Sequence, residues 1–246
     1  DNPNSQGTLK NEPSEHVTSF ASGTVTASSI ELTWTGSGGA VLPDNYLLVG
    51  KTGAGSYPSV ADGTPVADDL DWSDNSVAIN VSFGETTYTF SSLSSATAYD
   101  FKMYPYTNSG TSIDFKTGSE PSVSETTLKN APTDQADNIT FTNITTTSMV
   151  VNWQNGNGDN SLIIAKQGGS VNVSPSDGAT YTANSTFGSG QEIGTGNFVV
   201  YDGSGSSATI TGLTAGTAYH FKIFEYNNTG SDTKYNISDD TDNPNS

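Results

Sequence analysis

The sequence predicts an all-β protein composed of two tandem β-sandwich domains. Short runs that alternate apolar with polar residues are separated by clusters of Gly, Asn, Asp and Pro, which is the pattern of strands joined by turns. No long window has the apolar spacing of a helix. The same order of runs occurs twice along 246 residues that are 32% hydrophobic, which is enough for two domains that each bury a core.

The first elements of each copy are a strand that ends in tryptophan and a more apolar strand that follows it. "SIELTW" (Ser29–Trp34) corresponds to "SMVVNW" (Ser148–Trp153), and both alternate. "NYLLVGK" (Asn45–Lys51) corresponds to "SLIIAKQ" (Ser161–Gln167). The nearly continuous apolar character of this second pair predicts buried strands.

The last matching element of each copy is a tyrosine-rich strand. "LSSATAYDFKMYPYTNSG" (Leu93–Gly110) matches "LTAGTAYHFKIFEYNNTG" (Leu213–Gly230) almost letter for letter. Alternation along both segments predicts one face toward the core and the other toward water. One ancestral unit therefore occurs twice in the chain.

A long polar excursion separates the apolar strand from the tyrosine-rich strand in both copies. It runs over Ser56–Glu85 in the first copy and over Ser170–Asp202 in the second. Long loops in compact domains are usually functional or carry strands of their own. "VAINVSF" (Val77–Phe83) and "NFVVY" (Asn197–Tyr201) predict such extra strands. Any binding function is expected in these excursions.

Several residues together carry a resemblance to a known family. They are the two strand-ending tryptophans and two Leu/Tyr pairs of equal spacing: Trp34, Trp153, Leu93, Tyr99, Leu213 and Tyr219. On these residues the chain resembles two tandem fibronectin type III domains. Asp177–Asn227 is similar to a variant of this domain in large secreted and surface proteins of Bacteroidetes-type bacteria.

The resemblance implies immunoglobulin-like β-sandwiches and a tyrosine corner, in which the hydroxyl groups of Tyr99 and Tyr219 bond to nearby backbone. It also implies a secreted or cell-surface location. It implies little about function, because this fold carries many functions.

The repeat predicts the domain boundaries. Residues 14–128 form the first domain, residues 129–137 a linker that contains Pro132, and residues 138–246 the second domain. Residues 1–13 match the final strand and linker that follow the first domain, because the string TLKN-x-P occurs at Thr8–Pro13 and again at Thr127–Pro132. The second domain has no equivalent of that final strand, so we expect it to lack one.

The segment that would supply the missing strand is expected to be Gln6, Gly7, Thr8 and Leu9. The pentapeptide DNPNS opens the chain at Asp1–Ser5 and closes it at Asp242–Ser246, so the chain is interpreted as one 241-residue period of a tandem array. Neighbouring copies would then be partners, either in one covalent chain or by strand donation. The alternative is that the chain ends there and Asn236–Asn243 form a poor last strand.

Charge excludes some partners. The chain has 26 acidic residues against 8 basic ones, all of them lysine, and a net charge of −18. Such a chain repels phosphate backbones and anionic lipid surfaces, so neither nucleic-acid binding nor membrane insertion of this segment is expected. The absence of cysteine excludes disulfides and thiolate metal sites.

Two acidic runs are candidate calcium sites, because calcium prefers several carboxylate oxygens on a short loop. The alternative is a charged, solvated loop, and neither run matches the twelve-residue calcium loop. No other cofactor is expected. The candidate ligands are Asp68, Asp69, Asp71 and Asp74 in the first run, and Asp239, Asp240 and Asp242 in the second.

Aromatic residues in the excursions are candidate binding residues. Trp72 lies among aspartates and could stack on a sugar ring, or it could plug the edge of the sandwich. Tyr57, Tyr181 and Tyr201 have the same two interpretations.

The sequence predicts no enzyme. Its two histidines, His16 and His220, have no nucleophile in a catalytic setting nearby, and the chain has no arginine. The resulting hypothesis is a non-catalytic structural or adhesive repeat of an extracellular or cell-surface bacterial protein, in a tandem array or a strand-complemented filament. The alternative is a carbohydrate-binding or spacer module of a secreted multidomain enzyme.

Overall fold

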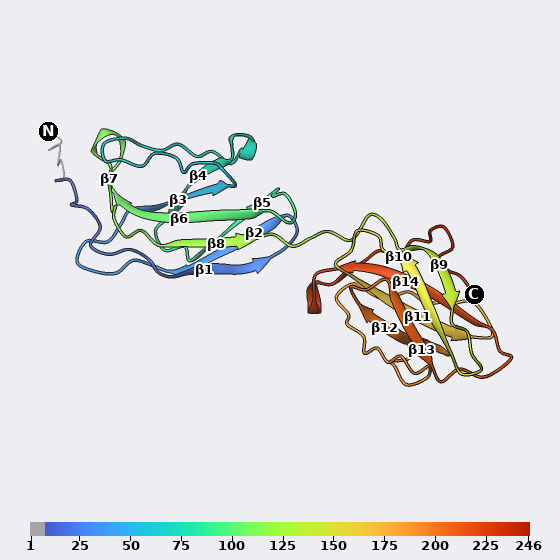
Figure 1. Cartoon of the computed structure of the whole chain (residues 1–246). Helices are drawn as coiled ribbons and strands as arrows, with labels where there is room; N and C mark the ends of the chain where they lie inside the picture. The colour runs from blue at the N-terminus through green and yellow to red at the C-terminus, as the bar shows by residue number, and fades with distance from the viewer. Residues whose placement is uncertain (1–7) are drawn as a thin grey trace. The chain divides into compact units, whose positions relative to one another are not determined.

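The structure is a computed structural model that describes residues 8–246, and the chain divides into two compact units, Asp1–Leu128 and Lys129–Ser246 (Figure 1). Gln6 and Gly7 of the expected inter-repeat strand lie outside the described residues. Nearly all regular structure is antiparallel β-sheet. Among residues 8–246, no helix has the length and apolar character needed to cross a membrane.

The first unit is built from two sheets. One has the strand order β1-β2-β5, and the other has the order β4-β3-β6-β7, with β8 also paired to β6. The strands are β1 (Thr18–Val25), β2 (Ser29–Thr35), β3 (Asn45–Thr52), β4 (Ser76–Ser82), β5 (Thr87–Ser91), β6 (Ala98–Thr107), β7 (Asp114–Phe115) and β8 (Ser122–Thr126), with short 3-10 turns η1 (Trp72–Asp74) and η2 (Gly110–Ser112).

The second unit repeats this arrangement. Its sheets have the orders β13-β10-β9 and β12-β11-β14-β15. The elements are β9 (Asp137–Thr142), β10 (Ser148–Gln154), β11 (Asn160–Gln167), β12 (Asn197–Gly203), β13 (Ser207–Thr211), β14 (Tyr219–Asn227), η3 (Gly230–Asp232) and β15 (Lys234–Tyr235). The predicted extra strands are thus present as β4 and β12.

Each unit has one core between its two sheets. In the first, Leu32 of β2 and Phe101 of β6 are fully buried in the same cluster. In the second, Val151 of β10 and Phe221 of β14 take these places. Alternation along β2 and β10 therefore points one face of each strand into a sandwich core, as the sequence predicts.

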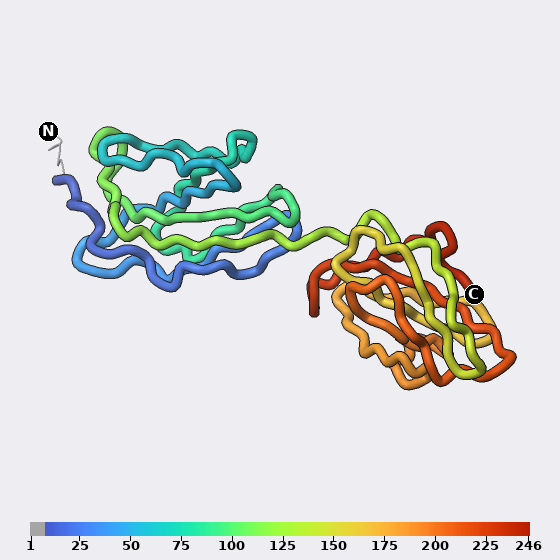
Figure 2. The backbone as a smooth tube through the Cα atoms, in the orientation of Figure 1, coloured from blue at the N-terminus to red at the C-terminus, as the bar shows by residue number. Residues whose placement is uncertain are grey.

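A second apolar layer covers the outer face of the larger sheet in each unit. Leu47 and Val49 of β3 pack there with Tyr57 and Val66 of the first excursion. This explains the unbroken apolar runs Tyr46–Val49 in β3 and Leu162–Ala165 in β11, because both faces of these strands are covered. Figure 2 shows the path of both excursions, which lie on the sheets and do not form free loops.

Candidate functional site

The first unit is closed by the residues that follow β8. The Thr127 backbone N–H donates to the Thr97 carbonyl at 3.1 Å, and the Thr97 N–H donates to the Thr127 hydroxyl oxygen at 3.0 Å. The Leu128 N–H donates to the Thr26 carbonyl at 3.0 Å, while the Leu128 carbonyl accepts from Ala96 at 3.1 Å. Thr127 is 2% exposed, so these two residues complete the edge of the sandwich.

The next two residues of the same string belong to the second unit. The Lys129 N–H donates to Asn228 Oδ1 at 3.0 Å, and Asn228 Nδ2 donates to the Lys129 carbonyl at 2.8 Å. The Lys129 ammonium also pairs with Asp159, and Pro132 is buried. Residues 129–137, which the sequence predicts as a linker, are therefore packed into the second unit, and β9 already begins at Asp137.

The N-terminal copy of the string docks on the first unit in the same way. The Lys10 N–H donates to Asn108 Oδ1 at 2.9 Å, and Asn108 Nδ2 donates to the Lys10 carbonyl at 2.8 Å. The Lys10 ammonium pairs with Asp44 and lowers the pKa of that carboxyl. Thr8 and Leu9 form no strand here, and Leu9 is 67% exposed.

TLKN therefore has two halves with different roles. At Thr127–Asn130, the Thr-Leu half closes one sandwich and the Lys-Asn half anchors the following one. At the N-terminus the Lys-Asn half is anchored, while the Thr-Leu half at Thr8–Leu9 is exposed. Sequence comparison found the repeated string but not the anchoring asparagines, although Asn108 and Asn228 occupy the same place in the two matching segments.

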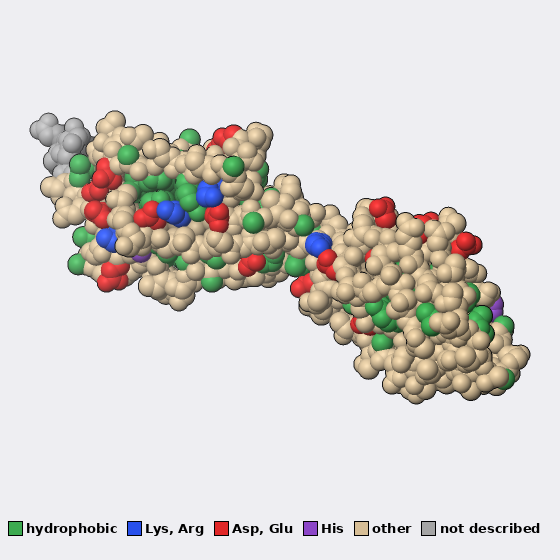
Figure 3. Space-filling model, in the orientation of Figure 1, with side chains coloured by type: hydrophobic (Ala, Val, Ile, Leu, Met, Phe, Trp, Pro, Cys, Tyr) green, Lys and Arg blue, Asp and Glu red, His purple; other side chains and the backbone are tan. Residues whose placement is uncertain are grey.

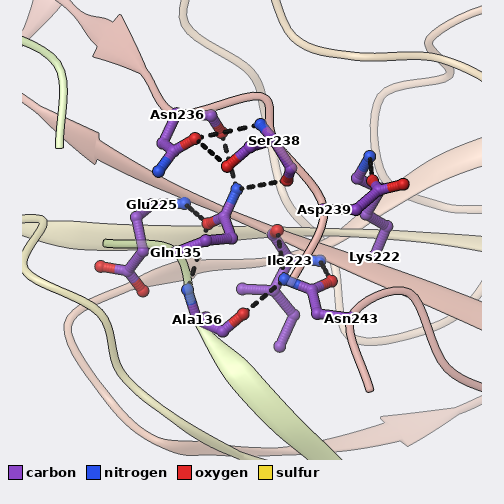
Figure 4. Close-up of polar contacts among 9 residues, drawn as sticks. All are labelled: Gln135, Ala136, Lys222, Ile223, Glu225, Asn236, Ser238, Asp239 and Asn243. Carbon is purple, nitrogen blue, oxygen red and sulfur yellow. Dashed lines mark hydrogen bonds and ion pairs between the residues drawn. The ribbon is translucent and has the colours of Figure 1, made fainter. Parts of the chain in front are cut away.

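The C-terminal segment packs along β14 through one fully buried side chain, Asn243 (Figure 4). Asn243 Nδ2 donates to the Ala136 carbonyl at 2.6 Å and to the Ile223 carbonyl at 3.0 Å. Its Oδ1 accepts from the Ile223 N–H at 3.0 Å. Gln135 lies beside it and accepts from the Glu225 N–H at 2.7 Å. The sequence does not mark either side chain: Asn243 is one of many asparagines in this chain, and Gln135 lies in no repeated motif.

Two residues later the segment adopts the register of β8. Asn245 and Phe221 exchange two backbone hydrogen bonds, of 2.8 and 3.0 Å, just as Val123 faces Phe101 in the first unit. The second unit, all of whose residues are described, nevertheless has no strand after β15, only two isolated bridges, this one and the one between Asp240 and Asn243. Asp242–Ser246 thus occupies the place of the first half of the closing strand.

The predicted structural residues are where the pattern places them. The Tyr99 hydroxyl accepts from the Ser94 N–H at 2.9 Å, and the Tyr219 hydroxyl accepts from the Thr214 N–H at 2.9 Å. Both units therefore contain a tyrosine corner. Leu93, Leu213, Trp34 and Trp153 are all buried.

Trp72 lies with its ring against the core of the first unit. It makes edge-to-face contacts with Tyr99, Phe90 and Phe101, at centroid distances of 4.8, 5.9 and 6.3 Å. A Cβ at Gly50 would lie 3.0 Å from the indole, so glycine makes room for it. The side chain is half-buried, and this packing leaves only part of the ring accessible to a ligand.

The three candidate tyrosines are half-buried in three different clusters. Tyr57 packs on the outer layer of the first unit, with the Lys51 and Lys102 ammonium groups 5.6 and 5.1 Å from its ring centre. Tyr181 packs on the outer layer of the second unit, and Tyr201 packs on its main core. Within the second unit, Tyr181 and Tyr201 therefore belong to two separate clusters.

The acidic runs use their carboxylates locally. Asp68 accepts from the backbone and side-chain N–H groups of Asn80, and Asp71 accepts from the Ser73 N–H. In the second run, Asp239 pairs with Lys222. The carboxylates of neither run come together around one point: among residues 8–246 no group of three or more acidic or histidine side chains could hold a metal ion. The remaining candidates, Asp69, Asp74, Asp240 and Asp242, are exposed.

Several lysines pair with acidic side chains on the surface of both units. Acidic side chains are spread over the visible face of both units, with a few lysines beside them (Figure 3). The Lys102 ammonium bonds to Glu120 at 2.9 Å, and this bond holds the pKa of the Glu120 carboxyl at about 2. His16 contacts the Gly118 carbonyl at 2.9 Å, and His220 lies on β14 opposite Lys166.

Comparison with known proteins gives one family model and several solved structures. The model of the purple acid phosphatase N-terminal domain matches residues 135–238. No curated protein matches the chain. A two-domain fibronectin type III segment of chicken tenascin is 15% identical and covers 90% of this chain and 98% of its own, with a TM-score of 0.37.

Two further structures are of the same kind. The central fibronectin type III array of RIM-binding protein is 12% identical, covers 90% of this chain and 67% of its own, and has a TM-score of 0.30. A fibronectin type III domain of human collagen XX is 20% identical, covers 49% of this chain and 100% of its own, and has a TM-score of 0.32.

The two units are fibronectin type III-like β-sandwiches. The strand orders and the tyrosine corners of the chain itself carry this assignment.

Proposed function

We propose that this chain is a non-catalytic structural module of an extracellular or cell-surface bacterial protein, one period of a tandem array. The observation that supports this most directly is the repeated use of TLKN. Lys10 and Lys129 dock on successive units through the same asparagine pattern, so the string serves as a standard joint. Repeating such a joint gives an extended chain whose stability adds unit by unit.

The covered outer faces support the same function. The excursions contribute β4 and β12 to the larger sheets, and their remaining residues pack on these sheets and enlarge each unit. The net charge of −18 would keep neighbouring arrays apart. Solubility and mechanical spacing are the properties that this design favours.

Single-molecule force spectroscopy of the full chain tests the proposal. Two separated unfolding events are expected, each releasing about 3.6 Å of contour length per residue of one unit. A chain that extends without force peaks, or that yields as a single unit, would contradict a role as a spacer made of independent modules.

A second candidate function is an accessory module of a secreted multidomain enzyme. The match of residues 135–238 to the purple acid phosphatase N-terminal domain favours it, because that domain is by its name part of an enzyme. If the accessory module acts by binding glycans, a pull-down with insoluble polysaccharides distinguishes it from a spacer. Retention of the full chain would favour the accessory function, and its absence would favour the spacer.

A further inference from the structure

The second unit carries an open groove beside Ser246. The groove has a volume of about 300 Å³, and its apolar floor is Phe141, Ile144, Met149 and Tyr219. Thr217 and Ala218 complete the lining. No lining side chain is charged, which is notable in a chain with 26 acidic residues.

The same place in the first unit is filled. Matching the turns before β2 and β10 pairs Val25 with Ile144 and Ile30 with Met149. Ile30 is 0% exposed and Val25 packs against the core, whereas Met149 is only half-buried and Ile144 is 66% exposed. Thr127 and Leu128 make the difference in the first unit, because they close this edge there.

The backbone along the groove also lacks a partner. The backbone N–H and C=O of Phe221 bond to Asn245 at this edge. Along a strand, the backbone groups of every second residue point to the same side, so Tyr219 directs its N–H and C=O into the groove. Thr217 lies one such step further on. In the described part of the chain Thr217 makes no hydrogen bond, whereas Thr97, its counterpart, is bonded to Thr127 through both backbone groups.

We propose that this groove is the receptor for Gln6–Leu9 of a second copy of this chain, which completes the half-strand that ends at Ser246. The register follows from two independent alignments. Asn245 occupies the position of Val123 in β8, and Ser246 occupies that of Ser124. The four residues after Ser246 would therefore occupy the positions of Glu125–Leu128. The repeated TLKN string places Thr8 and Leu9 at the positions of Thr127 and Leu128.

The chemistry of the segment fits the groove. Gln-Gly-Thr-Leu is uncharged, as is the groove. The Thr8 hydroxyl takes the role of Thr127, which donates to the Ser94 carbonyl at 2.6 Å, and here the counterpart acceptor is the Thr214 carbonyl. Leu9, 67% exposed in its own copy, covers Ile144 and Met149. Adding a strand to an open edge supplies main-chain bonds for affinity and side-chain pockets for specificity.

This inference rests on the proposed array, and amide hydrogen exchange of an extended chain tests it. The full chain is lengthened after Ser246 by Gln-Gly-Thr-Leu-Lys-Asn, and a matched chain carries aspartate in place of the leucine. The first extension is expected to slow exchange of the Thr217 and Tyr219 amides by roughly tenfold or more and to raise the unfolding midpoint of the second unit by about 5 °C. Equal exchange in the two extended chains would overturn the proposal.

A chain of two copies, with Gln6 of the second following Ser246, gives the second measurement. Protection of Thr217 in the first copy is expected, and Leu9→Asp in the second copy should remove it. Protection that survives Leu9→Asp would also overturn the proposal. Two unfolding events under force without this protection would leave the spacer function standing and refute only the receptor.

Discussion

Asn243 and Ile223 exchange two hydrogen bonds of 3.0 Å, with the Asn243 side-chain amide in the place of a strand backbone. In the first unit the counterpart of Ile223 is Met103, whose N–H donates to the Pro121 carbonyl at 3.2 Å. At this position the side-chain amide of Asn243 bonds to β14 in the second unit, whereas the backbone of Pro121 bonds to β6 in the first. This contact fixes the register of Asn245 against Phe221 and hence the position of the groove.

Replacing Asn243 by alanine should destabilise the second unit by about 2–3 kcal/mol, because it leaves buried groups of Ile223 and Ala136 without partners. Calorimetry is expected to show a lower unfolding midpoint for the second unit and an unchanged one for the first. Asn245→Ala is the matched control. Asn245 is only half-buried and keeps its backbone bonds, so a smaller loss is expected. Equal losses would contradict the role of Asn243.

The tyrosine corners offer a matched pair of variants. Tyr99→Phe removes the acceptor of the Ser94 N–H, and Tyr219→Phe removes that of Thr214. Each change should cost about 1 kcal/mol and lower only the unfolding midpoint of its own unit. The measurement is denaturant unfolding followed by residue-resolved resonances. A single transition that shifts for both variants would show that the units are not independent.

Trp72→Ala should destabilise the first unit by about 2–4 kcal/mol, since the indole contacts Tyr99, Phe90 and Phe101 but is half-exposed. Thermal unfolding measures the effect. Tyr57→Ala removes an aromatic of the outer layer and serves as the comparison, with a smaller expected loss. A stable Trp72→Ala variant that has lost glycan binding would instead favour the carbohydrate-binding function.

Acid should weaken the first unit in part through Glu120. Lys102 holds the folded-state pKa of Glu120 at about 2, below the ordinary 4.5. A carboxyl whose pKa is lower in the folded state than in the unfolded chain stabilises the folded state. This contribution is complete at pH values above 4.5 and is lost as the pH falls from 4.5 toward 2. Lys102→Met should therefore flatten the fall of the unfolding midpoint over this pH range. Glu120→Gln should flatten it as well, and an unchanged slope in both variants would refute the coupling.

Calcium should not stabilise the chain. Carboxylates such as Asp68 and Asp71 accept local hydrogen bonds, and among residues 8–246 no three acidic side chains converge. Titration calorimetry with calcium is expected to give no saturable heat, and millimolar calcium should leave both unfolding midpoints unchanged. Saturable binding that Asp68→Asn abolishes would restore the first acidic run as a site.

The sequence predicts the sandwiches well because their physics is local and repeated. The alternation of β2 and β10, the double-sided apolar character of β3 and β11, and the six-residue spacing of Leu93 and Tyr99 each correspond to a structural feature. Comparison of the two copies also predicts that the second unit lacks a closing strand of its own.

Two features could not be predicted because they depend on long-range contacts. The excursions look like polar loops, and only the buried outer faces of β3 and β11 explain why Tyr57 and Tyr181 pack inward. Asn243 contacts Ala136, which is far from it in the chain, and an asparagine in an asparagine-rich sequence gives no signal of burial. Proximity of this kind appears only once the chain is folded.

One sandwich is closed at the edge formed by Thr127 and Leu128, whereas its near-copy is open at the same edge. Amide hydrogen exchange of the unmodified chain compares Thr97 with Thr217 directly, because the two residues occupy the same position in the two units. We expect the Thr97 amide, bonded to Thr127, to be protected and the Thr217 amide to exchange nearly as fast as in an unfolded chain. Equal protection of the two amides would contradict it.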